Sequence, residues 1–521
     1  MALASAIVTA TDFARHQARL RPAAPAFWFE SQETSFRELD MRSSQCAQAL
    51  LAAGVRPGER IAVLSKNNDA FPVLWFGAMK ARACTVPVNI RLAPPEIAAI
   101  LRDSDATHLL VGHDFAALAE QIAEQCPMLK TVCQFEPGHP RLAGFDSWIA
   151  PFPPEDPCLP EQPDDDIIQL YTSGTTGLPK GVPLTHRNCM AQCESGTQQS
   201  YAQWQPEKSS LLALPVFHIA GALVALLSVL HGTRAVMVRE IVPAELARVI
   251  AEQRVAFAFL TPTVIQMILS APESANADYS ALEHVFYGAS PISEALLRRA
   301  MARLPCQFTQ VYGMTEATGV VTALPPEKHV PGKLLSCGAP IAGVELRVID
   351  AEGRDVPQGQ VGEVALRAPF IMRGYWKQPE ATAAAIDANG WYRSGDAGWV
   401  DADGDLFIHD RVKDMIVSGG ENVYPAEVEN AIDGHPDVAE VAVIGVPDER
   451  WGEAVKAIIV PKPGAPRDAG SIIAWARRRI GGFKVPKSVD FAEALPRNAT
   501  GKVLRRMLRD QYWTGSTRRV G

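Results

Sequence analysis

Short apolar runs alternate with amphipathic segments through the first part of the chain. The runs at residues 60–64, 235–238 and 255–260 predict strands, whereas the segments at 243–254 and from Ser293 onward predict helices. Such alternation is typical of sheets that carry helices on their faces. The longest apolar run, residues 219–230, is shorter than the ~20 residues of a membrane span, so it predicts a buried core helix and no transmembrane segment.

The pattern changes near Ser336 to short strands separated by turn signals. We therefore expect a barrel-like β subdomain from about residue 336. Asp401 to Asp405 resembles a calcium loop, but the glycine comes too early and the closing Glu is absent, so a hairpin turn is the better interpretation.

The last hundred residues predict a separate small α+β domain. Its expected elements are a helix at 425–432, strands at 438–446 and 455–460, a helix at 471–480 and a final short strand. We place a large N-terminal domain at residues 1–412 and a mobile C-terminal domain at residues 413–521.

Composition and charge narrow the class of protein. The chain has 521 residues, 47% of them hydrophobic, which is too long for one compact core. A net charge of -8 gives no global field for nucleic acid. The nine cysteines form no Cys-x-x-Cys pair, and the N-terminus has no basic region before its apolar stretch, so we expect reduced thiols and a cytoplasmic protein.

A glycine-rich loop follows the apolar run 167–171. Residues 172–181 hold three glycines, four hydroxyl side chains and one lysine, Lys180. Glycines let backbone N–H groups converge on an anion, and the lysine supplies positive charge, so the loop predicts binding of a polyphosphate. It is not a Walker loop, because Lys180 follows a proline and precedes a glycine.

Further motifs follow in a fixed order along the chain. They are Tyr312-Gly313-Met314-Thr315-Glu316, Tyr392-Arg393-Ser394-Gly395-Asp396, Asp410-Arg411-Val412-Lys413-Asp414, Ser418-Gly419-Gly420-Glu421-Asn422 and a last block at 496–502 that contains Lys502. With the loop at 172–181, this series resembles the class I adenylate-forming enzymes: acyl-CoA synthetases, nonribosomal adenylation domains and firefly-type luciferases. The resemblance spans essentially the whole chain and implies their α/β fold with a β subdomain and a small α+β C-terminal domain.

The resemblance implies roles for individual residues. The residues expected to contact ATP or AMP are Thr172, Ser173, Gly174, Thr175, Thr176, Gly177, Lys180, Gly288, Ala289, Tyr312, Gly313, Met314, Asp396 and Arg411. The expected catalytic residues are Lys502, Thr315, Glu316 and His218, with Glu316 also holding Mg²⁺. Lys413 would be the hinge between the domains, and Gly419, Gly420 and Glu421 would line the channel for coenzyme A.

The expected reaction has two halves. A carboxylate attacks ATP to give acyl-AMP and pyrophosphate. Rotation of the C-terminal domain about Lys413 then withdraws Lys502 from the site and brings in the Gly419-Gly420 loop, so that a thiol can attack the acyl group. By the same resemblance, His218, Ile219, Tyr287, Gly288 and Met314 would line the acyl pocket. None carries a carboxylate or an arginine, so the acid should have an uncharged tail.

Several alternatives stay open at this stage. A medium- or long-chain fatty acid is favoured, with a ferulate-, cinnamate- or benzoate-type acid as the second candidate. The clusters Arg477-Arg478-Arg479 and Arg505-Arg506 could meet the phosphates of CoA, or could give loose contact with a membrane surface. A luciferase-like oxygenase and an inactive binding protein are remote alternatives, and the protein could be a monomer or a homodimer.

Overall fold

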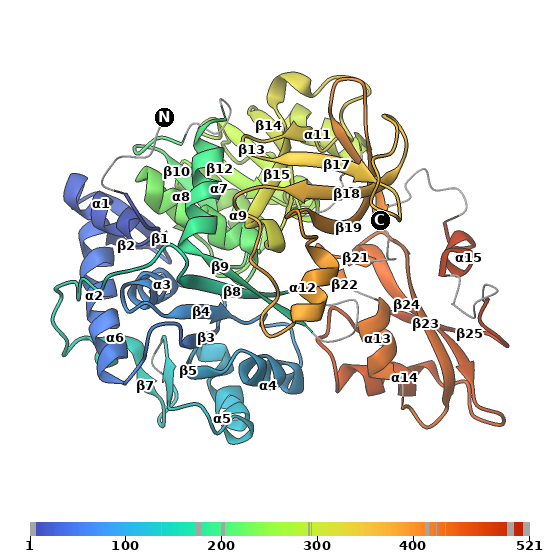
Figure 1. Cartoon of the computed structure of the whole chain (residues 1–521), viewed down its shortest axis with the longest axis horizontal. Helices are drawn as coiled ribbons and strands as arrows, with labels where there is room; N and C mark the ends of the chain where they lie inside the picture. Colours follow the sequence, from blue (N-terminus) through green and yellow to red (C-terminus); the bar gives the residue numbers. More distant parts are fainter. Residues whose placement is uncertain are drawn as a thin grey trace.

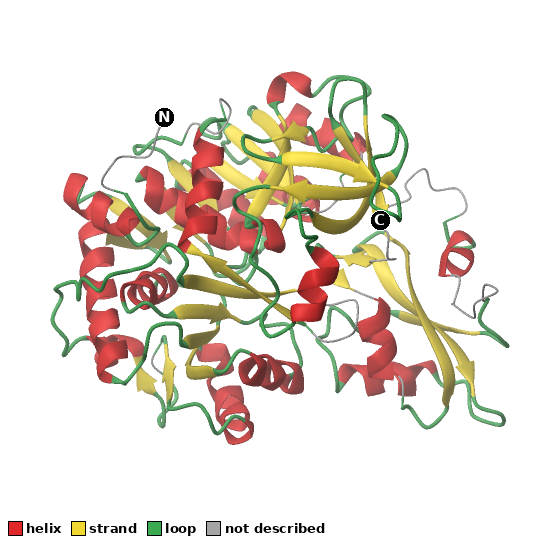
Figure 2. Cartoon of the chain, in the orientation of Figure 1, coloured by secondary structure: helices red, strands yellow, loops and turns green. Residues whose placement is uncertain are grey.

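The computed structural model describes residues 7–136, 138–172, 179–199, 204–289, 292, 294–411, 416–423, 425–432, 434–496 and 505–513. These residues form four sheets, of which the two largest make up most of the N-terminal part (Figure 1). Helices cover the sheets, as the alternation of apolar runs predicts (Figure 2). Among the described residues, no helix is both long and apolar enough to cross a bilayer.

The first large sheet has seven strands in the order β7-β6-β5-β3-β4-β8-β9. Their bounds are β3 (Arg60–Leu64), β4 (Cys84–Pro87), β5 (Ala106–Val111), β6 (Thr131–Gln134), β7 (Ala143–Gly144), β8 (Asp166–Thr172) and β9 (Lys180–Thr185). All are parallel except the β8–β9 hairpin, in which Thr172 pairs with Lys180. Apolar side chains of helices α4 (Pro94–Asp103) and α5 (Ala116–Gln125) pack on one face.

The second large sheet has nine strands in the order β16-β15-β14-β13-β12-β10-β11-β1-β2. Their bounds are β1 (Pro25–Phe29), β2 (Gln32–Ser35), β10 (Ser209–Leu212), β11 (Arg234–Met237), β12 (Phe257–Leu260), β13 (His284–Gly288), β14 (Gln307–Met314), β15 (Gly319–Leu324) and β16 (Ala339–Pro340). Helices α9 (Pro243–Glu252), α10 (Pro262–Ser270) and α11 (Glu294–Arg303) cover one face.

A layer of helices joins the two large sheets. It contains α2 (Phe36–Ala52), α3 (Ala70–Lys80), α7 (His186–Thr197) and α8 (Ile219–His231), with α1 (Asp12–Leu20) and α6 (Phe145–Ile149) beside it. Every residue of α3 is buried, and the largest apolar cluster draws side chains from α3, α8 and strands of both sheets. The run 219–230 is therefore a core helix, as predicted.

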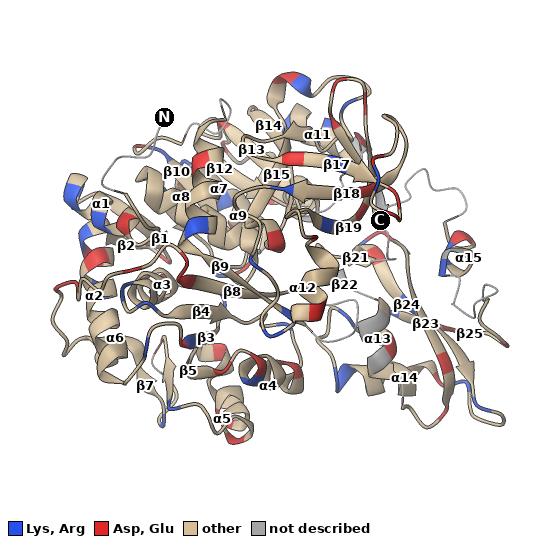
Figure 3. Cartoon of the chain, in the orientation of Figure 1, with Lys and Arg blue, Asp and Glu red and all other residues tan. Residues whose placement is uncertain are grey.

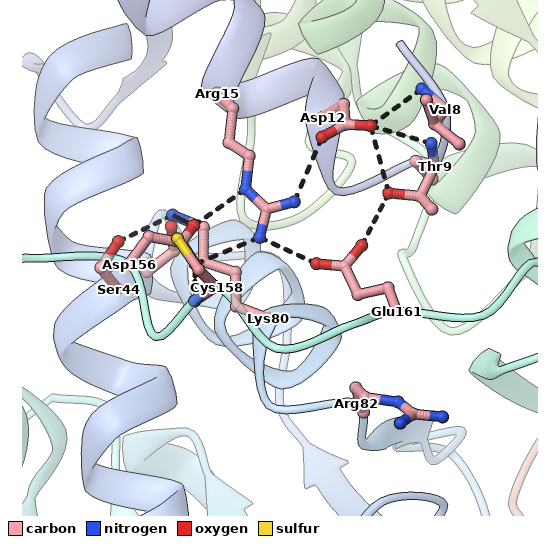
Figure 4. A network of polar contacts seen from close by, with 12 residues as sticks. Val8, Thr9, Asp12, Arg15, Ser44, Lys80, Arg82, Asp156, Cys158 and Glu161 are labelled. Carbon is pink, nitrogen blue, oxygen red and sulfur yellow. Dashed lines mark hydrogen bonds and ion pairs between the residues drawn. The ribbon is translucent and has the colours of Figure 1, made fainter. Parts of the chain in front are cut away.

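A buried polar network ties α1 to this layer (Figure 4). The Nζ atom of Lys80 is fully buried and donates to Asp40 Oδ1 at 2.6 Å and Ser44 Oγ at 2.8 Å. Arg15 in α1 donates to Asp156 and Glu161 at 2.8 Å. The stretch 152–166 thus supplies two carboxylates, Asp156 and Glu161, that balance the charges of Arg15 and Lys80.

The remaining sheets belong to the predicted β subdomain and the C-terminal part. Strands β17 (Glu345–Ile349), β18 (Gly362–Arg367), β19 (Tyr392–Val400) and β20 (Leu406–Arg411) form an antiparallel meander, and α12 (Pro379–Ala385) lies in the β18–β19 connection. Among the described residues β17 does not pair with β20, so the sheet is open rather than the expected barrel.

The C-terminal sheet has the order β22-β21-β24-β23, with β25 beside β24. Its strands are β21 (Ile416–Ser418), β22 (Glu421–Val423), β23 (Val438–Asp448), β24 (Gly452–Pro461) and β25 (Ser488–Phe491), and its helices are α13 (Pro425–Ile432), α14 (Ala469–Arg477) and α15 (Arg505–Asp510). Every predicted element is present here, and α15 was not predicted. Figure 3 shows acidic and basic residues interspersed along the ribbon, in line with the small net charge.

Two buried histidines make stability depend on pH. His186 accepts a hydrogen bond from the Ala10 N–H at Nδ1, and His284 lies 2.8 Å from the Thr309 hydroxyl. Desolvation lowers the pKa of each to about 4. Below pH 6.5 the unfolded chain therefore binds protons that the folded protein does not, so each histidine should cost about 2 kcal/mol of stability between pH 6.5 and 5.

We expect the urea concentration at the midpoint of unfolding to decrease as the pH is lowered from 7 to 5. In the variant His186→Asn this midpoint should decrease less steeply with pH. His113→Asn, at an exposed histidine, is the matched control and should keep the wild-type slope. A midpoint that is constant across this pH range would contradict the assignment.

Candidate active site

The β8–β9 hairpin and the turn after β14 bring three predicted residues together. The Thr172 hydroxyl donates to Glu316 Oε1 at 3.3 Å, although 144 residues separate them. Tyr375 donates to the same oxygen at 3.1 Å, and the Lys180 ammonium lies 4.5 Å from the centre of the Tyr375 ring. Tyr375 belongs to no predicted motif. Ser173, Gly174, Thr175, Thr176 and Gly177 lie outside the described residues.

A second contact joins β14 to the β subdomain. The Tyr312 hydroxyl donates to Asp396 Oδ2 at 2.6 Å, and Asp396 is buried. Asp396 lies opposite Arg411 in the register of β19 and β20, so these three predicted residues are neighbours. Lys413 and Lys502 lie outside the described residues.

The ends of β13, β14 and β15 pack so closely that two glycine positions leave no room for a side chain. A Cβ atom on Gly288 would lie 2.1 Å from the Val311 carbonyl oxygen, and one on Gly313 would lie 1.9 Å from the Gly319 carbonyl oxygen. Ala289 follows with φ of 65°, a left-handed conformation that costs energy for a residue with a side chain. Gly288, Ala289 and Gly313 thus shape this end of the sheet through their backbones.

A largely apolar cavity of about 150 Å³ begins at the same strand tips. Helices α7 and α8 and strands β10 and β12 to β15 contribute its walls. Its lining residues are Gln192, Gly196, Gln199, Trp204, Leu211, Ile219, Ala220, Leu223, Val224, Leu227, Phe257, Ala258, Phe259, Phe286, Ala289, Val311, Gly313, Met314, Gly319, Val320 and Ile341. None of them is charged.

The cavity includes Ile219 and Met314 of the expected acyl pocket but not Tyr287. The Tyr287 side chain is fully buried in the core, where its hydroxyl lies 3.0 Å from His329 Nε2. Successive strand residues point to opposite faces, so Phe286 lines the cavity and its neighbour cannot. The Tyr287 side chain therefore does not line this cavity. Gly288 and His218 border the cavity without lining it.

His218 faces the C-terminal part of the chain. It precedes α8, and its Nε2 lies 3.4 Å from Glu421 Oε2 in β22, while the other oxygen of Glu421 accepts from Arg91. Desolvation, with a smaller effect of the Arg91 charge, lowers the pKa of His218 to about 4, so its ring is neutral at pH 7. Sequence reasoning missed Arg91, which lies 330 positions before Glu421.

The acidic turn 401–405 is held by a lysine. The oxygens of Asp401, Asp403 and Asp405 lie within 4.8 Å of one another, the spacing of a cation site. The ammonium of Lys333 contacts all three carboxylates, with Nζ 2.7 Å from Asp403 and 2.9 Å from Asp405. The Lys333 side chain thus offsets the negative charge of these carboxylates, which agrees with the interpretation of the segment as a structural hairpin turn.

The comparisons place the chain among known proteins. The protein-family model for AMP-binding enzymes matches residues 14–376. The family model for the AMP-binding enzyme C-terminal domain matches residues 427–502. The fatty acid–acyl-carrier-protein ligase ScoC of Streptomyces coeruleorubidus is 40% identical, over 99% of this chain and 98% of its own. A feruloyl-CoA synthase of Amycolatopsis is 38% identical, over 95% and 97%.

Among solved structures, the amide bond synthetase McbA of Marinactinospora thermotolerans superposes with a TM-score of 0.88 at 29% identity. The match covers 97% of this chain and all of McbA. The protein therefore belongs to the AMP-binding enzyme family and has the adenylate-forming fold. The family predicted from the motifs is confirmed, as is the assignment to ligases.

Proposed function

We propose that the protein activates a carboxylic acid with ATP as an acyl-adenylate and then transfers the acyl group to the thiol of coenzyme A. One observation carries this proposal: residues 312–316, at the end of β14, contact the proposed ribose-binding residue, the apolar cavity and the strand that leads into the glycine-rich loop. Tyr312 contacts Asp396, Met314 lines the apolar cavity, and Glu316 contacts Thr172 beside the phosphate loop. Such an end can hold a nucleotide and an acyl group next to each other.

The chemistry follows from the leaving groups. A carboxylate is a poor electrophile, so its oxygen attacks the α-phosphorus of ATP and pyrophosphate departs. The thiolate of CoA then attacks the acyl carbon, and AMP departs with the bonding electrons. In this proposal Asp396 accepts from the ribose hydroxyls, Lys180 and Thr172 hold phosphates, and Thr315 and Lys502 stabilise the charge at the α-phosphorus.

Glu316 fits the expected magnesium site. Its side chain is buried, and no lysine or arginine of the described residues forms an ion pair with it. Among the described residues, the hydroxyls of Thr172 and Tyr375 donate to it, and a buried carboxylate with such partners suits an oxygen-preferring cation. Mg²⁺ bound with ATP would neutralise charge on the phosphate oxygens.

The cavity supports an acid with an uncharged, apolar tail. A fatty acid is the first candidate, because most of the walls are aliphatic or aromatic carbon. An engineered cavity of about 150 Å³ holds benzene, so this volume suits one six-membered ring or an alkyl chain with about as many carbons. The volume therefore favours the shorter fatty acids, and the aromatic walls Trp204, Phe257 and Phe286 favour an aryl acid as the second candidate.

The acceptor proposal rests on the surroundings of the Gly419-Gly420 loop. The Trp451 ring packs on Gly419, and Arg450 and Lys487 lie 4.6 and 5.6 Å from its centre. Desolvation and the nearby charges of Arg477 and Arg450 lower the pKa of Lys487. This cluster includes Arg477 of the first arginine run considered and can meet the phosphates of CoA, whereas Arg505 of the second already pairs with Glu429.

A substrate screen tests the proposal. We expect acid-dependent exchange of pyrophosphate into ATP across a C4 to C16 fatty acid series and with ferulate, cinnamate and benzoate, with the best activity near C6 to C8 or with a single ring. Thioester formation is then measured with CoA and, separately, with a phosphopantetheine carrier protein, the acceptor named for one relative. Absence of exchange with every acid would reject the proposal, and light emission or O₂ uptake would indicate oxygenase chemistry instead.

A further inference from the structure

One wall of the cavity carries a polar group that has no hydrogen-bond partner within the described part of the chain. Gln192 lies on the face of α7 that also contributes Gly196 to the lining, and Gln199 follows just after the helix. Its side chain is 4% exposed, and its Oε1 atom has no hydrogen-bond partner among the described residues. The opposite walls, from α8 and β12, offer Leu223, Leu227 and other apolar side chains.

An unpaired amide oxygen in such surroundings destabilises the protein when no ligand is bound. Buried polar side chains are nearly always hydrogen-bonded, and a leucine or methionine would pack here at lower cost. A few polar groups in an otherwise apolar pocket are typical of sites that select a ligand by one hydrogen bond. Gln192 therefore points to a ligand that supplies the missing partner.

We propose that Gln192 binds a hydroxyl group on the part of the acyl substrate that enters the cavity. A hydroxyl both donates and accepts, so it pairs with the amide in either orientation of the side chain. A charged substituent does not fit, because no lining residue could balance its charge. The inference rests on the proposed function and narrows its substrate class to hydroxylated acids, whether the hydroxyl is carried by an aromatic ring or by an alkyl chain.

The position of Gln192 agrees with this role. A Cβ atom on Gly319 would lie 3.8 Å from Gln192 Cδ and 2.8 Å from Leu223 Cδ2, so the glycine leaves room beside the amide. Gly319 is the register partner of Met314, which also lines the cavity. The amide therefore lies next to the wall that leads from the strand tips.

Matched pairs of acids test the proposal. We would measure kcat/KM of pyrophosphate exchange for 4-hydroxycinnamate against cinnamate and for 8-hydroxyoctanoate against octanoate. The wild type should prefer the hydroxylated acid of one pair by about 10- to 100-fold, and the pair that shows the preference identifies the source of the hydroxyl. Gln192→Met should bring the ratio close to one. Gln198→Met, the same change at an exposed position after α7, should keep it.

The outcomes separate this inference from the proposed function. Exchange with both acids of each pair at equal rates, or a ratio that Gln192→Met leaves unchanged, would overturn the role of Gln192 while the ligase function stands. If Gln192→Met does not fold, or no acid supports exchange, the test is the melting temperature of the wild type measured with each acid added. The hydroxylated acid of one pair should raise the melting temperature more than its unhydroxylated partner does. Equal shifts within both pairs would overturn the inference.

Discussion

Replacing Lys502 by alanine should reduce acyl-adenylate formation by about 10²- to 10³-fold, because in the proposed mechanism its ammonium stabilises the charge that builds on the α-phosphate. Thioester formation from supplied acyl-AMP should change little, since the same mechanism has Lys502 leave the site before the thiol attacks. The two half-reactions are measured separately, as pyrophosphate exchange and as release of AMP from synthetic acyl-AMP with CoA. Lys462→Ala, an exposed lysine in the same part of the chain, is the control.

Equal losses in both half-reactions would exclude the proposed division of labour. They would mean that Lys502 acts throughout the reaction or that the substitution damages the fold. An unchanged exchange rate would instead show that the charge at the phosphate is met by other groups.

Glu421→Gln should impair thioester formation and leave adenylation nearly unchanged, the reverse of what we expect for Lys502→Ala. In the structure Glu421 contacts both Arg91 and His218, so it joins the C-terminal sheet to the edge of the acyl site. Under the proposed two-step reaction, the contacts of Glu421 with Arg91 and His218 belong to the arrangement that accepts the thiol, so removing its charge should lower thioester formation by about 10- to 100-fold. Adenylation should be nearly unaffected, because the proposal assigns it to a different arrangement of the two domains.

The control for this variant is Glu493→Gln, an exposed carboxylate in the segment just after β25 that pairs only with Arg467 among the described residues. A parallel loss of pyrophosphate exchange in Glu421→Gln would contradict the assignment. Rapid-quench measurements of each half-reaction distinguish these outcomes.

The sequence predicts best what depends on neighbouring residues. The apolar runs at 60–64 and 235–238 place β3 and β11 to within a residue, and the helical pattern at 425–432 places α13, because these elements are determined by local sequence. The family motifs likewise predict that Thr172, Tyr312, Glu316 and Asp396 share one site, and their contacts agree with this.

Contacts between distant segments could not be predicted. Arg91 meets Glu421 only through the docking of two separate sheets, and Lys333 enters the acidic turn from a loop without a motif. A motif gives position along a strand but not which of two adjacent side chains faces a cavity, so it could not predict that Phe286 lines the cavity and Tyr287 does not. Gln192 gave no signal at all, because an amide on a helix is ordinary until its surroundings are known.

The close packing at Gly288 and Gly313 also bears on how the enzyme could change over evolution. Any side chain at these positions would displace a carbonyl of the adjoining strand, so this end of the site has almost no tolerated variation. The walls from α7 and α8 are less restricted, because apart from Gly196 they meet the cavity through side chains. New acids could therefore be accommodated by substitutions in two helices, while the strand ends, proposed to hold the nucleotide, are inherited unchanged.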